Sequence, residues 1–236
     1  MSKKPRVVGL PLRYELGREL KVGQDNTVYT LVAPNTPPHL RDMSVGLVAK
    51  VNHDRRNLHN AHTEAHADAK EAAMRGVLYK QHAYELLQAG LGAAIPESHF
   101  VLAEARQGRE GAKRYVELTV QRDIGRTSLN SMPGERRNEA LRQDISDLLC
   151  HAGILLSAVE IANEEVAPKN RINLRVDVGV RNLSGHSPAE CDELAITTRT
   201  PNILVAPDDT AYYVDFGQGQ WQEGMLETKE YILEQL

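Results

Sequence analysis

Residues 201–217, PNILVAPDDTAYYVDFG, hold two short apolar runs separated by the polar stretch Asp-Asp-Thr. Isoleucine, valine and tyrosine favour strands, and a short polar stretch between two such runs predicts a hairpin. A tight hairpin brings the start of its first strand beside the end of its second strand. Asn202 and Asp215 stand at these two places, so we expect a rigid two-stranded scaffold to present an amide and a carboxylate together. Oxygen ligands of these kinds suit a hard divalent cation.

The composition favours a globular chain of one large or two small domains. Of the 236 residues, 41% are apolar and 25% are charged, which is ample for a hydrophobic core. The net charge of −4 gives no electrostatic reason to expect nucleic acid or an anionic membrane as a partner. No signal-peptide pattern follows the basic start, and no run approaches the roughly 18 apolar residues of a membrane helix.

The two cysteines, Cys150 and Cys191, are too few for a disulfide framework. A reducing, cytoplasmic compartment is therefore expected, with one isolated disulfide as the alternative.

The predicted elements are mostly strands in the first half of the chain and mostly helices in the second half. An α+β fold is therefore expected. Strand patterns occupy residues 19–34 (as a hairpin), 43–53, 98–105, 113–121 and 171–180; helical patterns occupy 57–89, 137–166 and 223–236; residues 123–135 are linker-like, and residues 183–200 are polar and turn-like.

Five motifs in this order, VGQDNTVY, LVAK, VELTVQRDIGRTSL, PNILV and YYVDFG, resemble the protein-kinase-like superfamily across most of the chain. The spacing of 13 residues from Asn202 to Asp215 also matches that family. The resemblance implies a two-lobed α+β fold. Residues 1–124 would form a β-rich N-lobe with one long helix, and residues 125–236 would form a reduced, mainly helical C-lobe.

The same resemblance implies that the chain binds ATP and Mg²⁺. Lys50 would contact the phosphates, and Gly23 and Val28 would lie in the hairpin that covers the nucleotide. Asn202 and Asp215 would hold the metal ion, with Asp215 also counted as catalytic. The alternatives are a solvated lysine at Lys50 and a simple turn residue at Asn202.

The phosphate-binding lysine needs an orienting carboxylate from the helix expected at residues 57–89. Glu85 lies ten residues before Ile95 and resembles the helix glutamate of the family by that distance. Glu71 is the second candidate and Glu64 a third, and a solvated helix face is the alternative for each.

Two departures from the family pattern concern glycines and the catalytic base. Only Gly23 stands where the family usually has three glycines. The family's aspartate base lies five residues before the metal-binding asparagine, and that position is Thr197 here. A threonine does not accept a proton usefully at neutral pH. The base is therefore either absent or supplied by another residue.

Asp177 is the main internal candidate for the base. The segment INLRVDVGVRN resembles the strand that leads to the catalytic aspartate, and Asp177 lies five residues before Asn182. If residues 183–200 are an insertion in the catalytic segment, Asp177 serves as the base while Asn202 keeps the metal. The alternative is a polar residue at a strand end. Asp192 and Glu193 are further candidates.

Other features bear on the same reading. Arg199 stands three residues before Asn202, where the family carries a phosphate-contacting lysine. Only 19 residues follow Gly217, too few for a full activation segment with substrate-binding helices. In size the chain is similar to minimal kinases that bacteria inject into host cells or that phages encode. His59, His62 and His66 fit either a divalent metal site or, as we prefer, an exposed helix face.

The sequence therefore favours an ATP- and Mg²⁺-dependent phosphotransferase acting on serine or threonine hydroxyls of a protein substrate. A catalytically inactive pseudokinase, with Thr197 marking the lost base, and a small-molecule kinase are the alternatives. Nucleic acid and membrane are not expected as partners, and the oligomeric state is left open. A cytoplasmic protein is expected, with delivery into a host cell without a cleavable signal as the alternative.

Overall fold

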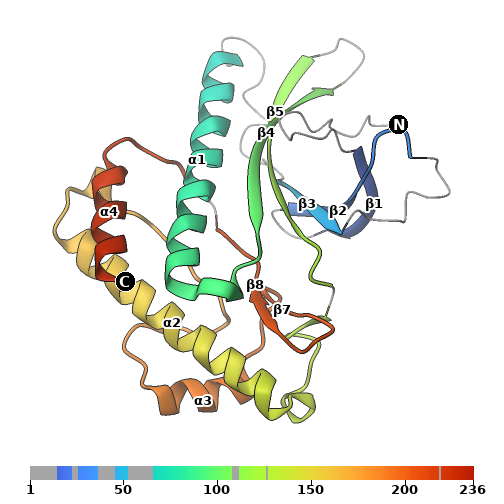
Figure 1. The fold of residues 1–236 in the computed structure, drawn as a ribbon. Coiled ribbons are helices and arrows are strands. Elements are labelled where there is room, and N and C mark those ends of the chain that lie inside the picture. Colours follow the sequence, from blue (N-terminus) through green and yellow to red (C-terminus); the bar gives the residue numbers. More distant parts are fainter. Residues whose placement is uncertain are drawn as a thin grey trace. The chain divides into compact units, whose positions relative to one another are not determined.

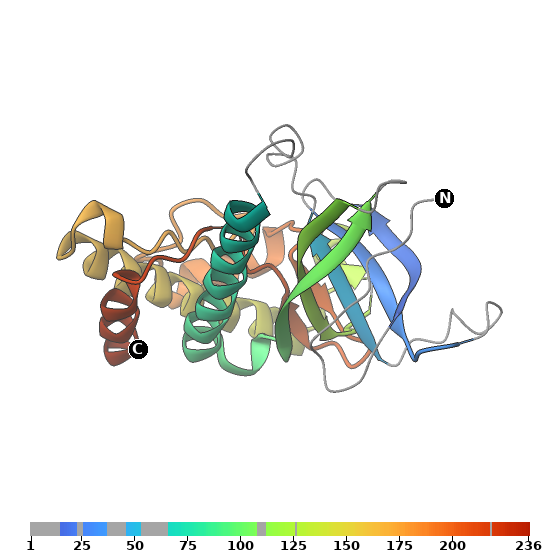
Figure 2. The same ribbon diagram turned by 90° about the horizontal axis from the view of Figure 1, so that it is seen from above.

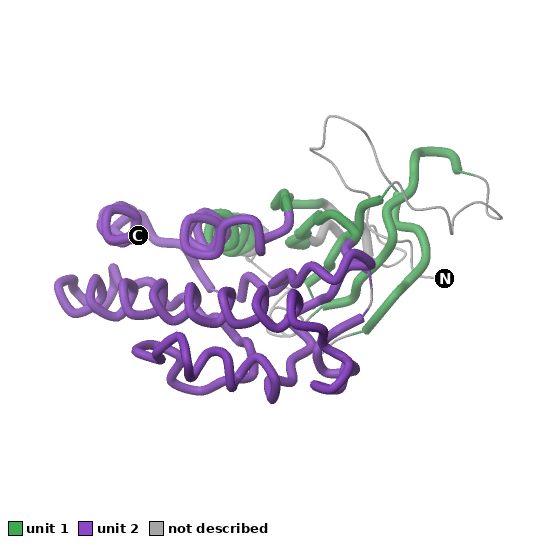
Figure 3. Tube along the Cα trace, turned by 60° about the horizontal axis from the view of Figure 1, so that its bottom comes forward, with its two compact units in different colours: residues 1–81, 97–123 green, residues 82–96, 124–236 purple. Residues whose placement is uncertain are grey.

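The computed structural model of the chain describes residues 15–22, 26–36, 46–52, 66–107, 112–125, 127–217 and 219–236. The chain divides into two compact units (Figure 3). Unit 1 comprises Met1–Gln81 and Glu97–Asp123, and unit 2 comprises His82–Pro96 and Ile124–Leu236. The division after Asp123 lies one residue before the boundary expected at 124, but residues 82–96 belong to unit 2. The mixture of helices and antiparallel strands confirms the α+β class.

Unit 1 contains a five-stranded antiparallel sheet in the order β1-β2-β3-β5-β4 (Figure 1). Figure 2 shows the sheet twisting from β1 to β4. The hairpin and the strands expected in the first half of the chain are confirmed. Their bounds are β1 Glu15–Val22, β2 Asn26–Val32, β3 Leu47–Asn52, β4 Ser98–Gln107 and β5 Ala112–Arg122.

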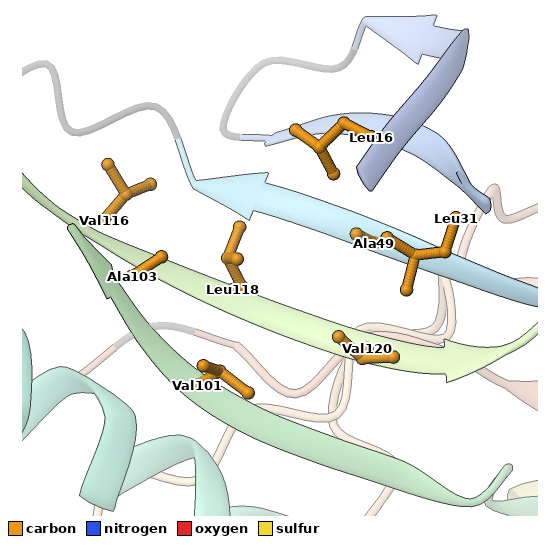
Figure 4. Packing of buried hydrophobic residues seen from close by; sticks show 8 residues of the cluster. All are labelled: Leu16, Leu31, Ala49, Val101, Ala103, Val116, Leu118 and Val120. Atoms are coloured by element: carbon orange, nitrogen blue, oxygen red, sulfur yellow. The ribbon is translucent and has the colours of Figure 1, made fainter. Parts of the chain in front are cut away.

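Alternation along the strands separates the two faces of this sheet. One face carries a cluster of buried apolar side chains (Figure 4). Its members are Leu16, Leu31, Ala49, Val101, Ala103, Val116, Leu118 and Val120. The polar residues Glu117, Thr119 and Gln121 alternate with the last three and therefore belong to the opposite face.

The first part of helix α1 (His66–Leu91) covers this polar face. The ammonium nitrogen of Lys70 lies 5.9 Å from the ring centroid of Tyr115, and Lys80 Nζ lies 2.9 Å from Glu117 Oε2. Both partners are on β5, so α1 runs along that strand. The helix expected at 57–89 is thus confirmed from His66 onward, and residues 57–65 lie outside the described part of the chain.

Unit 2 is built on the long helix α2 (Glu139–Glu164), which confirms the helix expected at 137–166. Its N-terminus is capped by Asn138, whose side chain accepts a hydrogen bond from Leu141 N–H at 2.8 Å. By length and apolar content alone α2 could cross a membrane, a test that the core helix of a soluble protein also meets. More than half of its most apolar stretch is buried in the folded chain.

A small antiparallel sheet, two further α-helices, three short 3-10 helices and the last part of α1 complete unit 2 in the described residues. The sheet has the order β6-β7-β8, and its β7–β8 pair confirms the hairpin expected at residues 201–217. Helix α4 confirms the helix expected near the end of the chain. The bounds are β6 Thr127–Ser128, β7 Ile203–Val205, β8 Ala211–Tyr213, α3 Pro188–Thr197 and α4 Met225–Gln235, with short 3-10 helices η2 Gly92–Ala94, η3 Gly134–Arg136 and η4 Pro168–Asn170.

The prediction of a strand at residues 171–180 is wrong. Burial does alternate there, with Ile172 and Val178 among the buried residues, but the segment belongs to no strand. Side chains bond to its backbone where a neighbouring strand would otherwise do so. Ile172 N–H donates to Asn163 Oδ1 at 2.8 Å, and Asp177 N–H donates to Tyr213 Oη at 3.1 Å.

The prediction of a turn-like structure at residues 183–200 is also wrong, because this stretch contains helix α3. Ser187 and Glu190 form a capping box at its start. Glu190 N–H donates to Ser187 Oγ at 3.4 Å, and Ser187 N–H donates to Glu190 Oε2 at 2.7 Å. Pro188 occupies the first helical turn. The sequence Ser-Pro-Ala-Glu is a known start signal for a helix, which the polar composition of the stretch obscured.

Arg137 anchors the opposite end of α3. Its side chain is fully buried and donates to the carbonyl oxygens of Ala195, of Thr198 at 2.6 Å and of Met132 at 3.3 Å. Two of these carbonyls belong to the C-terminal end of α3, where the partial negative charge of a helix favours a cation. Arg137 therefore fixes α3 to the segment that precedes α2.

Replacing Arg137 with methionine tests this anchor. We expect Arg137→Met to lower the free energy of unfolding by about 3 kcal/mol, because charged hydrogen bonds are lost and buried carbonyls are left unpaired. Urea unfolding measures the loss, and Arg136→Met, at an exposed neighbouring position, is the control. Equal stability of the two variants would contradict the anchoring role.

Candidate functional site

Asn202 and Asp215 lie at the same end of the β7–β8 hairpin. Asn202 directly precedes β7, Asp215 follows β8 by two residues, and Ile203 pairs with Tyr213. Val214 N–H donates to the Asn202 carbonyl oxygen at 2.9 Å, which extends the pairing beyond the two strands. Both side chains are half-buried. The hairpin thus fixes the backbone from which the amide and the carboxylate project.

Asp177 joins this hairpin through its own peptide groups. Asn202 Nδ2 donates to the Asp177 carbonyl oxygen at 3.0 Å, and Thr200 Oγ1 donates to the same oxygen at 3.4 Å. On the other side, Asp177 N–H donates to Tyr213 Oη at 3.1 Å. The structure therefore brings Asp177 beside Asn202 although 25 positions separate them in the sequence.

Gly179 allows the chain to leave and return at this point. Its φ of +77° lies in the region that favours glycine. A Cβ at this position would lie 2.6 Å from the Arg199 carbonyl oxygen, too close for any side chain. The chain between Gly179 and Arg199, which includes α3, therefore forms an excursion that leaves and returns at these two residues.

Each of the two aspartates has one carboxylate oxygen oriented by the backbone. Asp177 Oδ1 accepts from Gly179 N–H at 3.2 Å, and Asp215 Oδ1 accepts from Gly217 N–H at 3.1 Å. Gly217 has a φ of +66°, another conformation that favours glycine. The Asp177 side chain is exposed, so an acceptor molecule can approach it.

The donor set at the hairpin consists of oxygen atoms. Because the Asn202 amide nitrogen donates to Asp177, the amide oxygen is the atom suited to a cation. Mg²⁺ is usually bound through one or two carboxylates together with substrate phosphates and waters. In the described part of the chain no three His, Cys, Asp or Glu side chains group to hold a metal ion. Asn202 and Asp215 fit Mg²⁺ only if phosphate and water supply the remaining ligands.

The other residues considered for the base have different contacts. Thr197 is exposed at the end of α3, and its hydroxyl donates to carbonyl oxygens of Glu193 and Leu194 at 3.4 and 3.5 Å. Asp192 Oδ1 accepts from Ser146 Oγ on α2 at 2.6 Å. Arg199 donates to the Met132 carbonyl oxygen at 3.2 Å. None of these hydrogen bonds involves Asp177 or the hairpin end.

Glu85 bonds to a helix at the end of the chain. Its Oε2 accepts from Lys229 Nζ of α4 at 2.7 Å and lies 3.1 Å from His82 Nδ1. The His82 ring packs on Trp221 with centroids 3.9 Å apart. Burial by itself raises the pKa of Glu85, but the hydrogen bonds and charges of Lys229 and His82 outweigh it and lower that pKa below its ordinary value.

Lys50 stands directly opposite Val28 of β2 and Thr119 of β5 in the sheet of unit 1. Residues opposite each other share a face, so all three belong to the polar face covered by α1. Glu71 is exposed on α1 and forms an ion pair with Arg75. Gly23, Glu64, His59 and His62 lie outside the described residues, and nothing is described of the His66 side chain.

Three residues that the sequence analysis missed hold Asp177 in place: Thr200, Tyr213 and Gly179. Tyr213 and Thr200 are fully buried. In the sequence, only two features could have drawn attention to them: the tyrosine stands two residues before Asp215, and the glycine stands two residues after Asp177. Neither feature indicates that the residue contacts Asp177.

No protein-family model matches this chain, and no curated protein matches it at a significant level. The geometry of the described residues is therefore the basis for the function considered next.

The ion pair of Glu85 predicts a pH dependence of stability. Because folding lowers the pKa of this carboxyl, its stabilising contribution is present above the unfolded pKa of about 4.3 and is lost as pH falls through the folded value. Urea unfolding of wild type and Glu85→Gln should therefore differ most above about pH 5 and converge below about pH 4.

The groups facing Glu85 are Lys229 from α4 and His82 from α1. Glu230→Gln, on the exposed side of α4, is the matched control and should show no such convergence. A gap between wild type and Glu85→Gln that stays constant from pH 7 to pH 3.5 would contradict the prediction.

Proposed function

We propose that this chain is an ATP- and Mg²⁺-dependent phosphotransferase of the protein-kinase-like type, acting on serine or threonine hydroxyls of a protein. Unit 1 would correspond to the N-lobe and unit 2 to a reduced C-lobe. Asn202 and Asp215 would ligate the metal ion, and Asp177 would act as the base.

The observation that carries this proposal is the hydrogen bond from Asn202 Nδ2 to the Asp177 carbonyl oxygen. Phosphoryl transfer needs a carboxylate that orients the attacking hydroxyl close to the ligands of the metal. Asp177 lies beside Asn202, and Asp215 follows the other strand at the same end of the hairpin, which supports a base next to two metal ligands. The proposal also explains why Thr197, and not an aspartate, stands five residues before Asn202. Residues 183–200 are then an excursion inserted between the base and the metal-binding asparagine.

The remaining roles follow from chemistry. A bound Mg²⁺ ion neutralises the charge that the phosphates of ATP carry. The exposed Asp177 carboxylate would accept the proton of the acceptor hydroxyl as its oxygen attacks the γ-phosphorus and ADP leaves. Gly179 N–H holds one oxygen of that carboxylate, which fixes its orientation. Lys50, as a compact cation on a strand, would contact the phosphates.

Nucleotide binding tests the metal ligands. We expect Asp215→Asn to weaken binding of Mg²⁺-ATP at least tenfold in calorimetry, because the carboxylate that offsets the charge of the ion is gone. Asp147→Asn, at an exposed aspartate of α2, is the control and should bind as wild type does. A folded wild-type chain that takes up no Mg²⁺-ATP would overturn the proposed function.

Transfer of labelled phosphate tests the base. Asp177→Asn should lower transfer by about 10²- to 10⁴-fold while Mg²⁺-ATP affinity stays the same, since general base catalysis contributes on that scale. Thr197→Ala should leave the rate unchanged. The acceptors are lysate proteins, serine and threonine peptides, and aminoglycosides for the small-molecule alternative. If the chain binds nucleotide but transfers phosphate to no acceptor, it is a pseudokinase and the proposed base is wrong.

A further inference from the structure

Glu117 of β5 occupies a partly desolvated position between the sheet and α1 within unit 1. Its Oε2 lies 2.9 Å from Lys80 Nζ of α1 and accepts from Asn52 Nδ2 of β3 at 3.4 Å. The side chains of Lys80 and Glu117 are only 7% and 16% exposed. Three elements of unit 1 therefore meet at one carboxylate.

Helix α1 has a glycine where this carboxylate approaches it. A Cβ on Gly76 would overlap Glu117 Oε1 and Cδ. Glycine is the least favourable residue in a helix interior apart from proline. Its presence at this position makes room for a charged group, one helical turn before Lys80.

Lys50 belongs to the same group of side chains. It stands opposite Thr119, so Glu117 is its diagonal neighbour on the same face of the sheet. Long side chains span such diagonals. Asn52, two positions further along β3, bonds to Glu117, so the carboxylate contacts β3 as well as α1. Lys50, Lys80 and Glu117 thus lie on or against one part of this face, where two cations accompany one carboxylate.

A partly buried ion pair is a weak source of stability, because desolvation of the two charges offsets most of their attraction. The pair of Lys80 and Glu117 satisfies both charges within unit 1 but adds little net stability, which leaves room for a second role. Positioning a third charged group on the same face is such a role.

We propose that Glu117 is the positioning residue that orients Lys50 toward a nucleotide phosphate, and that Lys80 holds the Glu117 carboxylate in place. The proposal rests on the proposed phosphotransferase function and refines it. It assigns to a strand residue the part that the sequence analysis gave to Glu85 of the helix.

Binding of a series of nucleotides tests this assignment. Adenosine, Mg²⁺-ADP and Mg²⁺-ATP are titrated into wild type, Glu117→Gln and the control Glu97→Gln, whose side chain is 80% exposed. We expect Glu117→Gln to weaken both phosphorylated ligands at least tenfold and adenosine less than twofold. The control should match wild type for all three ligands. Equal affinities of wild type and Glu117→Gln for Mg²⁺-ATP would overturn the proposal, and so would a selective loss in Glu85→Gln instead.

Two further variants separate positioning from a structural role. In the double variant Lys80→Glu with Glu117→Lys, the ion pair is restored with its charges exchanged. Its melting temperature should exceed that of either single variant, while Mg²⁺-ATP affinity stays low because Lys50 has lost its carboxylate. Recovery of both properties together would show a purely structural pair and overturn the proposal.

Gly76→Ala displaces the carboxylate without changing any charge. It should also weaken Mg²⁺-ATP more than adenosine, and it decides the question if Glu117→Gln does not fold. Failure of wild type to bind Mg²⁺-ATP would overturn the proposed function itself. Wild-type binding with unchanged phosphate selectivity in Gly76→Ala and Glu117→Gln would overturn this inference alone.

Discussion

The carbonyl oxygen of Asp177 is the acceptor around which the candidate site in unit 2 is organised. It receives hydrogen bonds from Asn202 and Thr200, and the adjoining N–H is bound by Tyr213. These contacts hold together two segments between which the chain makes a long excursion. The excursion costs little entropy beyond that of a shorter loop, because closure entropy grows only slowly with loop length. Gly179 at the crossing and Arg137 at the end of α3 make the excursion a folded element.

A site of this kind depends on the rigidity of the elements around it. Tyr213 is fixed in β8, and Thr200 Oγ1 both donates to Asp177 and accepts from Asn202 N–H at 3.1 Å. Two glycine N–H groups orient one oxygen of each aspartate. Groups held in this way need little reorganisation when a charged ligand binds, which is what electrostatic catalysis requires. The irregular backbone at residues 171–180 is therefore a precondition of the site, since a regular strand would use the N–H of Asp177 for pairing.

Local sequence patterns predicted helices and strands well where the apolar residues follow a single helical or strand period. The apolar spacing that includes Leu141, Ile145 and Leu148 identified α2, and alternation identified β5. The same alternation at residues 171–180 correctly indicated which side chains are buried. It could not indicate that this segment pairs with no neighbouring strand. A fixed spacing of five residues before Asn202 leads to Thr197, whereas the contact of Asn202 with Asp177 spans 25 positions. The pair of Lys80 and Glu117 joins residues far apart in the sequence, and no local pattern indicates such contacts.

Glu85 has structural partners that its spacing in the sequence does not indicate. Lys229 is nearly buried, and a buried cation without a carboxylate would be strongly destabilising. Glu85 meets that need in unit 2, and it would be required there whether or not it had any part in phosphate binding. In unit 1, Glu117 answers the corresponding need of Lys80. Helix α1 thus contributes a cation to one unit and an anion to the other, five positions apart. Each charge is explained first by its own unit, and the strand carboxylate, which shares a sheet face with Lys50, is the one whose position suits phosphate recognition.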